Sequence, residues 1–167
     1  YWTDKSGTGH HAKVYQDNNN YKPKYYSAGM NSKPTVQFDG SNDYLVLANG
    51  RNDFHEWDKL TVLLVYEDWG SGNWRRLMGN VDDKTGGWCL FWSNNSTFRF
   101  RMVGTSGSDD RSFTSQTKAQ THLISLSYNG YFRSGTVNGT TEFIFNDTGA
   151  MPDSPNADFI LGGNGRD

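Results

Sequence analysis

The stretch FDGSNDYL, residues 38–45, places two aspartates, an asparagine and a glycine between two apolar runs. Asp39-Gly40 readily supplies the positive φ of a tight turn, and residues 44–47 have the composition of a strand that follows it. The stretch therefore predicts a reversal of the chain between two strands. A calcium loop is the alternative reading, but the contiguous calcium pattern places its glycine later and ends on a glutamate that this stretch lacks.

Short strand-like runs of the same kind recur along the chain, with turn signals such as Asn-Gly between them. In FRFRM, residues 98–102, apolar and cationic side chains alternate, as they do in a strand with one buried face. We expect strands at residues 12–15, 34–38, 43–48, 60–67, 74–79, 87–93, 97–103, 111–115, 121–128, 131–137, 141–146 and 157–162. One short helical segment is expected at residues 53–59, where Asp53 and Glu56 fit a capping box.

This succession of strands with almost no helix predicts an all-β fold, an antiparallel two-sheet sandwich or jelly roll. Aromatic residues make up 15% of the chain and glycine occurs 19 times, which suits pleated surfaces joined by tight turns. The 167 residues are enough for one domain, spanning 1–167. A net charge of −2 gives no electrostatic reason to expect nucleic acid or an anionic membrane as partner. No apolar run is long enough for membrane insertion.

The usual catalytic and cofactor motifs are missing from the sequence. GTGHHA, residues 7–12, matches a dinucleotide fingerprint, but no strand precedes it and no helix follows it. A glycosidase needs two carboxylates that flank one sugar bond. The acid pairs Glu67-Asp68, Asp82-Asp83 and Asp109-Asp110 are adjacent residues at expected strand ends or in loops, and adjacent side chains diverge on a strand. The sequence thus favours a chain that is not an enzyme.

The tryptophans are the most suggestive feature for binding, because an aromatic face can stack on the C–H surface of a sugar ring. Trp88 and Trp92 alternate with an apolar residue and are expected in the core, whereas Trp69 and Trp74 flank a glycine-rich loop and are expected at the surface. The predicted ligand-binding residues are Trp69, Asn73, Trp74, Arg75 and Arg76. Arg99 and Arg101 are expected either to line an outer or concave face or only to keep that face soluble.

Several motifs, in order along the chain, resemble those of laminin G-like domains in the concanavalin A-like lectin/glucanase superfamily. WTDKSGTGHHA (residues 2–12) is similar to the opening W-x-D-x-S-G-N-G-x-x-A, and FDGSNDYL to F-D-G-x-x-D-Y-L. LTVLLV (60–65) resembles the strand that follows, HLISLSYNG (122–130) resembles H-x-I-x-x-x-Y-D-G, VNG (137–139) the next turn, and FILGG (159–163) the strand I-x-I-G-G.

The resemblance implies a jelly roll that binds glycans or proteins at surfaces. Related sandwiches can bind calcium, so the resemblance also allows a calcium site, to which Asp39, Asn42 and Asp43 would contribute part of the shell and either Asp4 or the missing C-terminal strand the rest. The paired acids of the superfamily's glucanases are missing. Members continue into one more strand after I-G-G, so we expect this chain to be a segment of a longer protein, with another segment or chain at its C-terminal edge.

The leading hypothesis is a non-catalytic module of a secreted, cell-surface or virion protein, such as a phage appendage, that recognises a glycan or polysaccharide and serves adhesion. The alternative is a structural or assembly domain of a fibre or capsid with no small ligand. A glycan-active hydrolase is a third hypothesis and the least favoured. Neither nucleic acid nor any cofactor other than calcium is expected.

Overall fold

The computed structural model describes residues 1–14, 19–48, 59–70, 73–81, 86–94, 97–104, 107–114, 116–146 and 157–163. The predicted helical segment at residues 53–59 lies outside these, apart from its last residue. Within the described ranges, no helix has the length and apolar character needed to cross a membrane.

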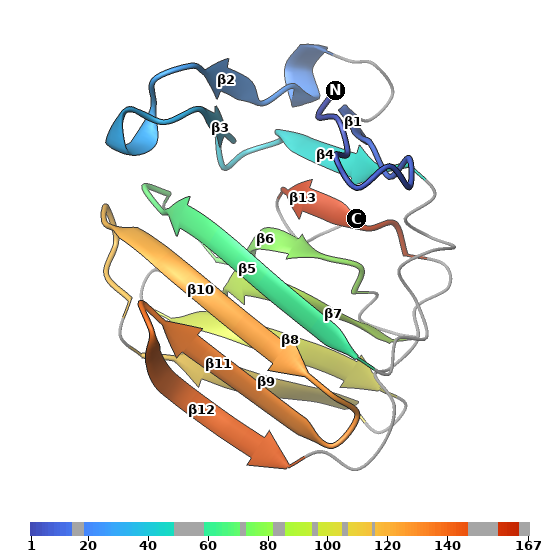
Figure 1. The fold of residues 1–167 in the computed structure, drawn as a ribbon, viewed down its shortest axis with the longest axis vertical. Helices are drawn as coiled ribbons and strands as arrows, with labels where there is room; N and C mark the ends of the chain where they lie inside the picture. The colour runs from blue at the N-terminus through green and yellow to red at the C-terminus, as the bar shows by residue number, and fades with distance from the viewer. Residues whose placement is uncertain are drawn as a thin grey trace.

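Two antiparallel sheets stack face to face, and a small third sheet stands beside them (Figure 1). The larger sheet has seven strands in the order β1 (Ala12–Val14), β4 (Tyr44–Leu47), β13 (Ile160–Gly162), β6 (Arg75–Gly79), β7 (Gly87–Trp92), β8 (Phe98–Gly104) and β9 (Gly107–Phe113). The second has four strands in the order β12 (Thr140–Asn146), β11 (Phe132–Val137), β10 (Thr121–Tyr128) and β5 (Leu60–Glu67). The third pairs β2 (Lys24–Tyr26) with β3 (Thr35–Gln37), and short 3₁₀ turns span Asn19–Tyr21 and Met30–Ser32.

The main core lies between the seven-stranded and four-stranded sheets, because alternating strands turn their apolar side chains toward each other. Phe98, Phe100 and Met102 of β8 are buried, as the FRFRM pattern predicts. The predicted core tryptophans, Trp88 and Trp92, are each 1% exposed. From the opposite sheet the core receives side chains that include Val62, Tyr66, Ile124, Leu126, Tyr128 and Val137. The architecture is the all-β jelly-roll sandwich that the sequence predicts.

Strand β13 joins the two ends of the chain in one sheet, because it lies between β4 and β6. Gly162 has a φ of +74°, and a Cβ added there would lie 2.3 Å from a ring carbon of Phe38. The Phe38 ring thus occupies the space that a side chain at position 162 would fill. The FDG motif at residues 38–40 and the LGG motif at residues 161–163 therefore meet in one packing contact.

Two strands differ from the expectation. β9 begins at Gly107 rather than residue 111, so Asp109 and Asp110 lie within a strand and not in a loop. β2 was not expected, since all three of its residues are exposed and leave no apolar alternation to detect. β2 and the first part of β9 carry polar or exposed side chains on both faces. The alternation of apolar and polar residues that identifies a strand is therefore missing there.

Candidate functional site

The outer face of the seven-stranded sheet, turned away from the core, carries a row of charged and aromatic side chains. The strand register places Arg76 opposite Phe91, and Phe91 opposite Arg99. It also places Arg101 opposite Asp110. Because side chains at paired positions share a face, these residues project together from β6, β7, β8 and β9. We call them, with Trp74, the arginine–aromatic cluster.

Trp74 covers the apolar part of this cluster. Its ring stacks on Phe91 with centroids 5.2 Å apart and planes only 3° from parallel. The Arg101 guanidinium carbon lies 4.7 Å from the centre of the Trp74 ring and 5.0 Å from that of Phe91. Phe91 is buried in a small second apolar cluster, whereas Trp74 remains 38% exposed. The indole is therefore a surface element fixed from below by a buried ring and from the side by a cation.

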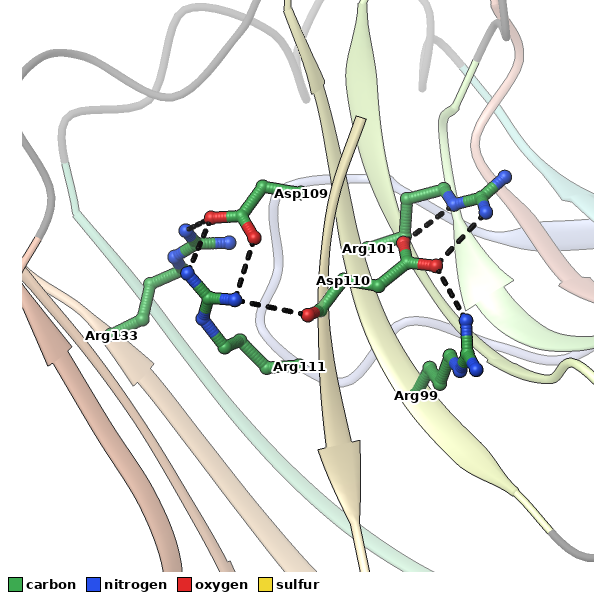
Figure 2. Close-up of polar contacts among 6 residues, drawn as sticks. All are labelled: Arg99, Arg101, Asp109, Asp110, Arg111 and Arg133. Carbon is green, nitrogen blue, oxygen red and sulfur yellow. Dashed lines mark hydrogen bonds and ion pairs between the residues drawn. The ribbon is translucent and has the colours of Figure 1, made fainter. Parts of the chain in front are cut away.

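Asp110 fixes the arginines of the cluster (Figure 2). Arg101 donates two hydrogen bonds to its carboxylate, from Nε at 2.7 Å and from Nη2 at 3.0 Å, and Arg99 donates one from Nη1 at 3.0 Å. Burial raises the pKa of Asp110, but the hydrogen bonds and charges of Arg101 and Arg99 outweigh it, so the net pKa lies below its usual value. The carboxylate is therefore ionised at neutral pH and holds both guanidinium groups in place.

The loop before β6 presents a second exposed indole on a well-anchored support. Trp69 is 74% exposed, while its neighbours Asp68 and Gly70 are held by the rest of the fold. Arg75 Nη2 donates to the Asp68 carboxylate at 2.7 Å, and Lys118 Nζ donates to the Gly70 carbonyl at 2.6 Å. Because these bonds hold the residues on both sides of Trp69, the backbone that carries the exposed ring is fixed.

The predicted ligand-binding residues divide into three groups. Trp69, Asn73 and Trp74 are exposed, and Arg76 is half-buried on the outer face. Arg75 is buried and points to the inner side of β6, toward Asp68 and the Trp92 ring, so its contact is with the loop. Whether these residues touch a ligand stays a prediction.

Sequence reasoning missed Phe91 and Asp110, and it placed Arg99 and Arg101 on one face without naming what holds them there. The alternation in FRFRM does signal that both arginines share a face. Their partner depends on the β8–β9 register, which places Asp110 opposite Arg101 and which composition alone does not give.

Asp109 lies on the opposite face of β9 from Asp110 and belongs to a separate network (Figure 2). It pairs with Arg111 at 2.7 Å and with the buried Arg133 of β11. The Arg111 guanidinium also lies 3.5 Å from the centre of the Phe145 ring. These contacts tie the two sheets together at one edge of the sandwich. The two adjacent acids diverge, as predicted for strand neighbours, and so do not form a carboxylate pair around one bond.

The FDGSNDYL stretch is a turn in which the carboxylates bond the backbone. Asp39 Oδ1 accepts hydrogen bonds from the amides of Ser41, Asn42 and Asp43, at 2.8, 3.1 and 3.1 Å. Asp43 Oδ2 in turn accepts from the Asp39 amide at 2.9 Å. Burial raises the pKa of Asp43, with the charge of Asp39 as a smaller cause.

Calcium takes six to eight oxygen ligands. In the turn, one oxygen of each carboxylate, Asp39 Oδ1 and Asp43 Oδ2, already accepts hydrogen bonds from the backbone. Asp4, a further ligand that the resemblance allows, accepts four hydrogen bonds from its own loop. Among the described residues, no group of three or more acids, histidines or cysteines could hold a metal ion. The calcium hypothesis stays a prediction for a binding titration to check.

The topology and core define an antiparallel two-sheet jelly-roll β-sandwich, and its fold is similar to that of solved domains that include a laminin G pair. Domain 4 of AbnA, a GH43 extracellular arabinanase from Geobacillus stearothermophilus solved in complex with arabinotriose, has a TM-score of 0.75 and 18% sequence identity. That match covers 98% of this chain and 79% of the other.

Domains LG4-5 of the mouse laminin alpha1 chain match with a TM-score of 0.50 and 14% identity, over 63% of this chain and 28% of that one. The carbohydrate-binding module CBM66 from Bacillus subtilis is more distant, with a TM-score of 0.47 and 8% identity over 86% of this chain and 90% of that one. No protein-family model matches the chain, and no curated protein matches its sequence significantly.

Proposed function

We propose that this chain is a non-catalytic glycan-binding module and that the arginine–aromatic cluster, with Trp69 nearby in sequence, is its binding surface. The observation that carries the proposal is the half-exposed Trp74 ring, stacked on buried Phe91 and bordered by Arg101. An aromatic face that is already fixed can stack on the C–H surface of a sugar with little loss of side-chain entropy. The ordered guanidinium and carboxylate groups beside it can hydrogen-bond hydroxyls of known orientation.

The fold comparison is consistent with this use of the sandwich. The arabinanase domain, which shares the fold over nearly all of this chain, was solved with an oligosaccharide, arabinotriose. An exposed glycan ligand fits a secreted, cell-surface or virion protein, so these locations belong to the proposal. The sugar itself is not carried over from that domain, because 18% identity shows a shared fold and not a shared site.

A glycan array followed by calorimetry on the bound glycans tests the proposal. Trp74→Ala removes the stacking surface and should weaken binding by about 2 kcal/mol or more, which is roughly 30-fold. Trp69→Ala should weaken it less, since that ring has fewer fixed neighbours. Trp2→Ala is the matched control, because Trp2 is also an exposed tryptophan and lies outside the cluster. If the array shows no binding, or if Trp74→Ala binds like the parent, the proposal is wrong.

A structural or assembly role is the second candidate, and one surface favours it. On the outer face of the four-stranded sheet, Leu63 is 72% exposed, and Val65 and Leu123 are exposed and directly opposite each other in the register. An exposed apolar patch of this kind can serve as a contact surface for another chain. Sedimentation of the protein with and without Leu63→Lys checks it: an assembly should dissociate in the variant, and a monomer at high concentration would contradict the role.

A further inference from the structure

The outer face of the four-stranded sheet carries no charged side chain over its middle. It lies on the opposite side of the sandwich from the arginine–aromatic cluster, and none of the described segments crosses it (Figure 1). Leu63, Val65, Leu123 and Ile144 project from it, with exposed fractions of 72, 58, 46 and 69%. The other outward positions within residues 61–65, 123–127 and 134–136 are serine or threonine. Charged residues are depleted in this way at the centre of protein–protein interfaces.

The charges of this face lie at the two ends of β5. Glu67 ends the strand and Lys59 directly precedes it, and both follow the alternation that turns Leu63 outward. Lys59 is exposed and Glu67 is half-buried. Leu63 is the midpoint of this stretch, with opposite charges at equal distances along the strand. The face is therefore complementary in charge to a copy of itself that is turned end for end.

The positions of these charges select one orientation of two copies. A two-fold axis that runs across the strands at Leu63 reverses the second copy, so that Lys59 of each chain faces Glu67 of the other. An axis along the strands would bring Lys59 against Lys59 and Glu67 against Glu67. The reversed arrangement also keeps the strands of the two sheets aligned, which is a common way for sheets to pack face to face.

The side chains between the charges fit the same arrangement. The register pairs Leu123 with Val65 and Ser127 with Thr61, so the aliphatic pair lies on one side of Leu63 and the hydroxyl pair on the other. In the reversed copy, the aliphatic pair of each chain lies over the hydroxyl pair of the other, and Leu63 meets Leu63. Larger side chains thus pack against smaller ones across the interface, as interdigitating sheet faces require.

The size of the face indicates how strong such a contact is. β5 and β10 have eight residues each. Four strands of this length form a face of about 26 by 19 Å, which is about 500 Å² in each copy. A dimer would bury about 1,000 Å² in total, close to the lower limit for a specific interface. We therefore expect a reversible dimer in equilibrium with the monomer.

We propose that two copies of this chain pack through the outer faces of their four-stranded sheets, with the two-fold axis at Leu63, and form a bivalent glycan binder. The two arginine–aromatic clusters then lie on the far sides of the dimer and face in opposite directions. Such a dimer bridges two separate polysaccharide chains and cannot place both surfaces on one flat layer of glycan. The bivalent action rests on the proposed glycan-binding function, whereas the dimer itself does not.

Sedimentation equilibrium over a series of protein concentrations measures the dimer. The average mass should rise from that of one chain toward that of two. Leu63→Lys places two ammonium groups against each other on the axis and should weaken the dimer at least about a hundredfold. Tyr25→Lys is the matched control, because Tyr25 is 67% exposed and belongs to the separate β2–β3 sheet. Circular dichroism and urea unfolding establish that each variant is folded. A chain that stays monomeric at every concentration, or a dimer that Leu63→Lys leaves intact, overturns the proposal.

A charge exchange tests the orientation of the two copies. Lys59→Glu replaces two opposite-charge contacts with two like-charge contacts and should weaken the dimer about tenfold. The double variant Lys59→Glu with Glu67→Lys restores opposite charges and should dimerise within about threefold of the parent. Lys33→Glu makes the same charge change at an exposed residue between β2 and β3 and should have no effect. If the double variant dimerises as weakly as Lys59→Glu, the two copies do not meet in this orientation and the proposal is wrong.

Light scattering with a soluble polysaccharide that the glycan array identifies tests the bivalent action. The parent should cross-link the polysaccharide, whereas Leu63→Lys should bind it with the same affinity per site in calorimetry and leave it dispersed. A parent dimer that binds the polysaccharide without cross-linking it overturns the bivalent action. If a monomeric parent binds glycans, the proposed function stands and this inference fails. If a dimer forms and no glycan binds, the proposed function fails and the dimer stands.

Discussion

Trp74 has a backbone conformation that bulky residues seldom adopt. Its φ is +62°, in the left-handed region where a side chain with a Cβ is strained. Such strain costs about 1–3 kcal/mol and persists where the surrounding contacts maintain it. Here the stack on Phe91 and the Arg101 contact are those contacts. The contacts with the sheet thus stabilise a backbone conformation at Trp74 that is unfavourable by itself.

Two substitutions at position 74 separate the effect of losing the ring stack from the effect of the backbone strain. Trp74→Ala loses the stack and keeps the strain, whereas Trp74→Gly loses the stack and relieves the strain. We expect Trp74→Gly to be more stable than Trp74→Ala by about 1 kcal/mol in urea unfolding, although glycine normally destabilises an element. Both variants should lose glycan binding equally. Equal stability of the two, or a more stable alanine variant, would show that position 74 is not strained.

Asp4 organises the N-terminal loop through its carboxylate. The Ser6 hydroxyl is the main cause that lowers the pKa of Asp4, followed by the Ser6 amide, with smaller contributions from Thr8 and His10. Because the pKa is lower in the folded chain than its ordinary value near 4, the ionised carboxylate adds stability that is complete above about pH 4. That contribution is lost as the pH falls toward the lowered pKa.

Urea unfolding of the parent and Asp4→Asn at a series of pH values measures this contribution. The parent should be the more stable at pH 7, and the difference should shrink steadily below about pH 4. Ser6→Ala, which removes the leading donor, should move the loss to higher pH. A stability difference that is the same at pH 7 and pH 3 would mean that the Asp4 charge plays no part.

At the scale of elements, β13 depends on the absence of a side chain at Gly162. Alanine there would need a strained positive φ and would also contact the Phe38 ring, so we expect Gly162→Ala to destabilise the fold by about 2–4 kcal/mol. Gly139→Ala is the matched control, because Gly139 has a φ of +83° with no atom within 4 Å of an added Cβ. Its cost should be about 1 kcal/mol, from strain alone.

A double variant identifies the contact as the cause. In a Phe38→Ala background the ring is gone, so Gly162→Ala should cost only as much as Gly139→Ala does in urea unfolding. A cost that stays the same with and without the Phe38 ring would mean that the two motifs do not act through this contact.

Strand prediction succeeded where one face is buried and failed where neither face is apolar. β5 and β10 have the predicted bounds, because their alternation directly records which side meets the core. β9 escaped prediction at its start because Asp109 and Asp110 are polar on both faces. Each acid is nonetheless satisfied by arginines of other strands or the opposite sheet. The alternation in a single sequence shows which residues are buried but not which residues they pair with. β9 is defined by its pairing residues, so its start could not be predicted.

The same distinction explains what could be predicted of the candidate site. Exposed Trp69 and Trp74 follow from their position beside glycine-rich sequence. The burial of Arg75 does not, because it requires the position of Asp68 across the loop. The cluster around Asp110 is likewise a product of register, since its members come from four strands.

For the whole molecule, the seven-stranded sheet is continuous only through β13. On one side lie β1 and β4 from the N-terminal part of the chain, and on the other lie β6 to β9 with the arginine–aromatic cluster (Figure 1). β13 pairs with both β4 and β6, and Phe159 just before it is buried in the main core beside Trp88. The strand therefore couples the N-terminal strands to the half of the sheet that carries the candidate site.

A chain cut after residue 156 should consequently lose cooperative folding, because β4 and β6 each lose one of their two neighbouring strands and the core loses the Phe159 ring. We expect poorly dispersed amide signals in NMR spectra and no sharp urea transition. A chain cut after residue 163 keeps β13 and should unfold like the parent, which makes it the control. Adding a synthetic peptide of residues 157–167 to the shorter chain should restore dispersion, since the peptide can pair with β4 and β6 on both of its edges. If the shorter chain is as stable as the control, the two halves of the sheet fold independently and the coupling assigned to β13 does not exist.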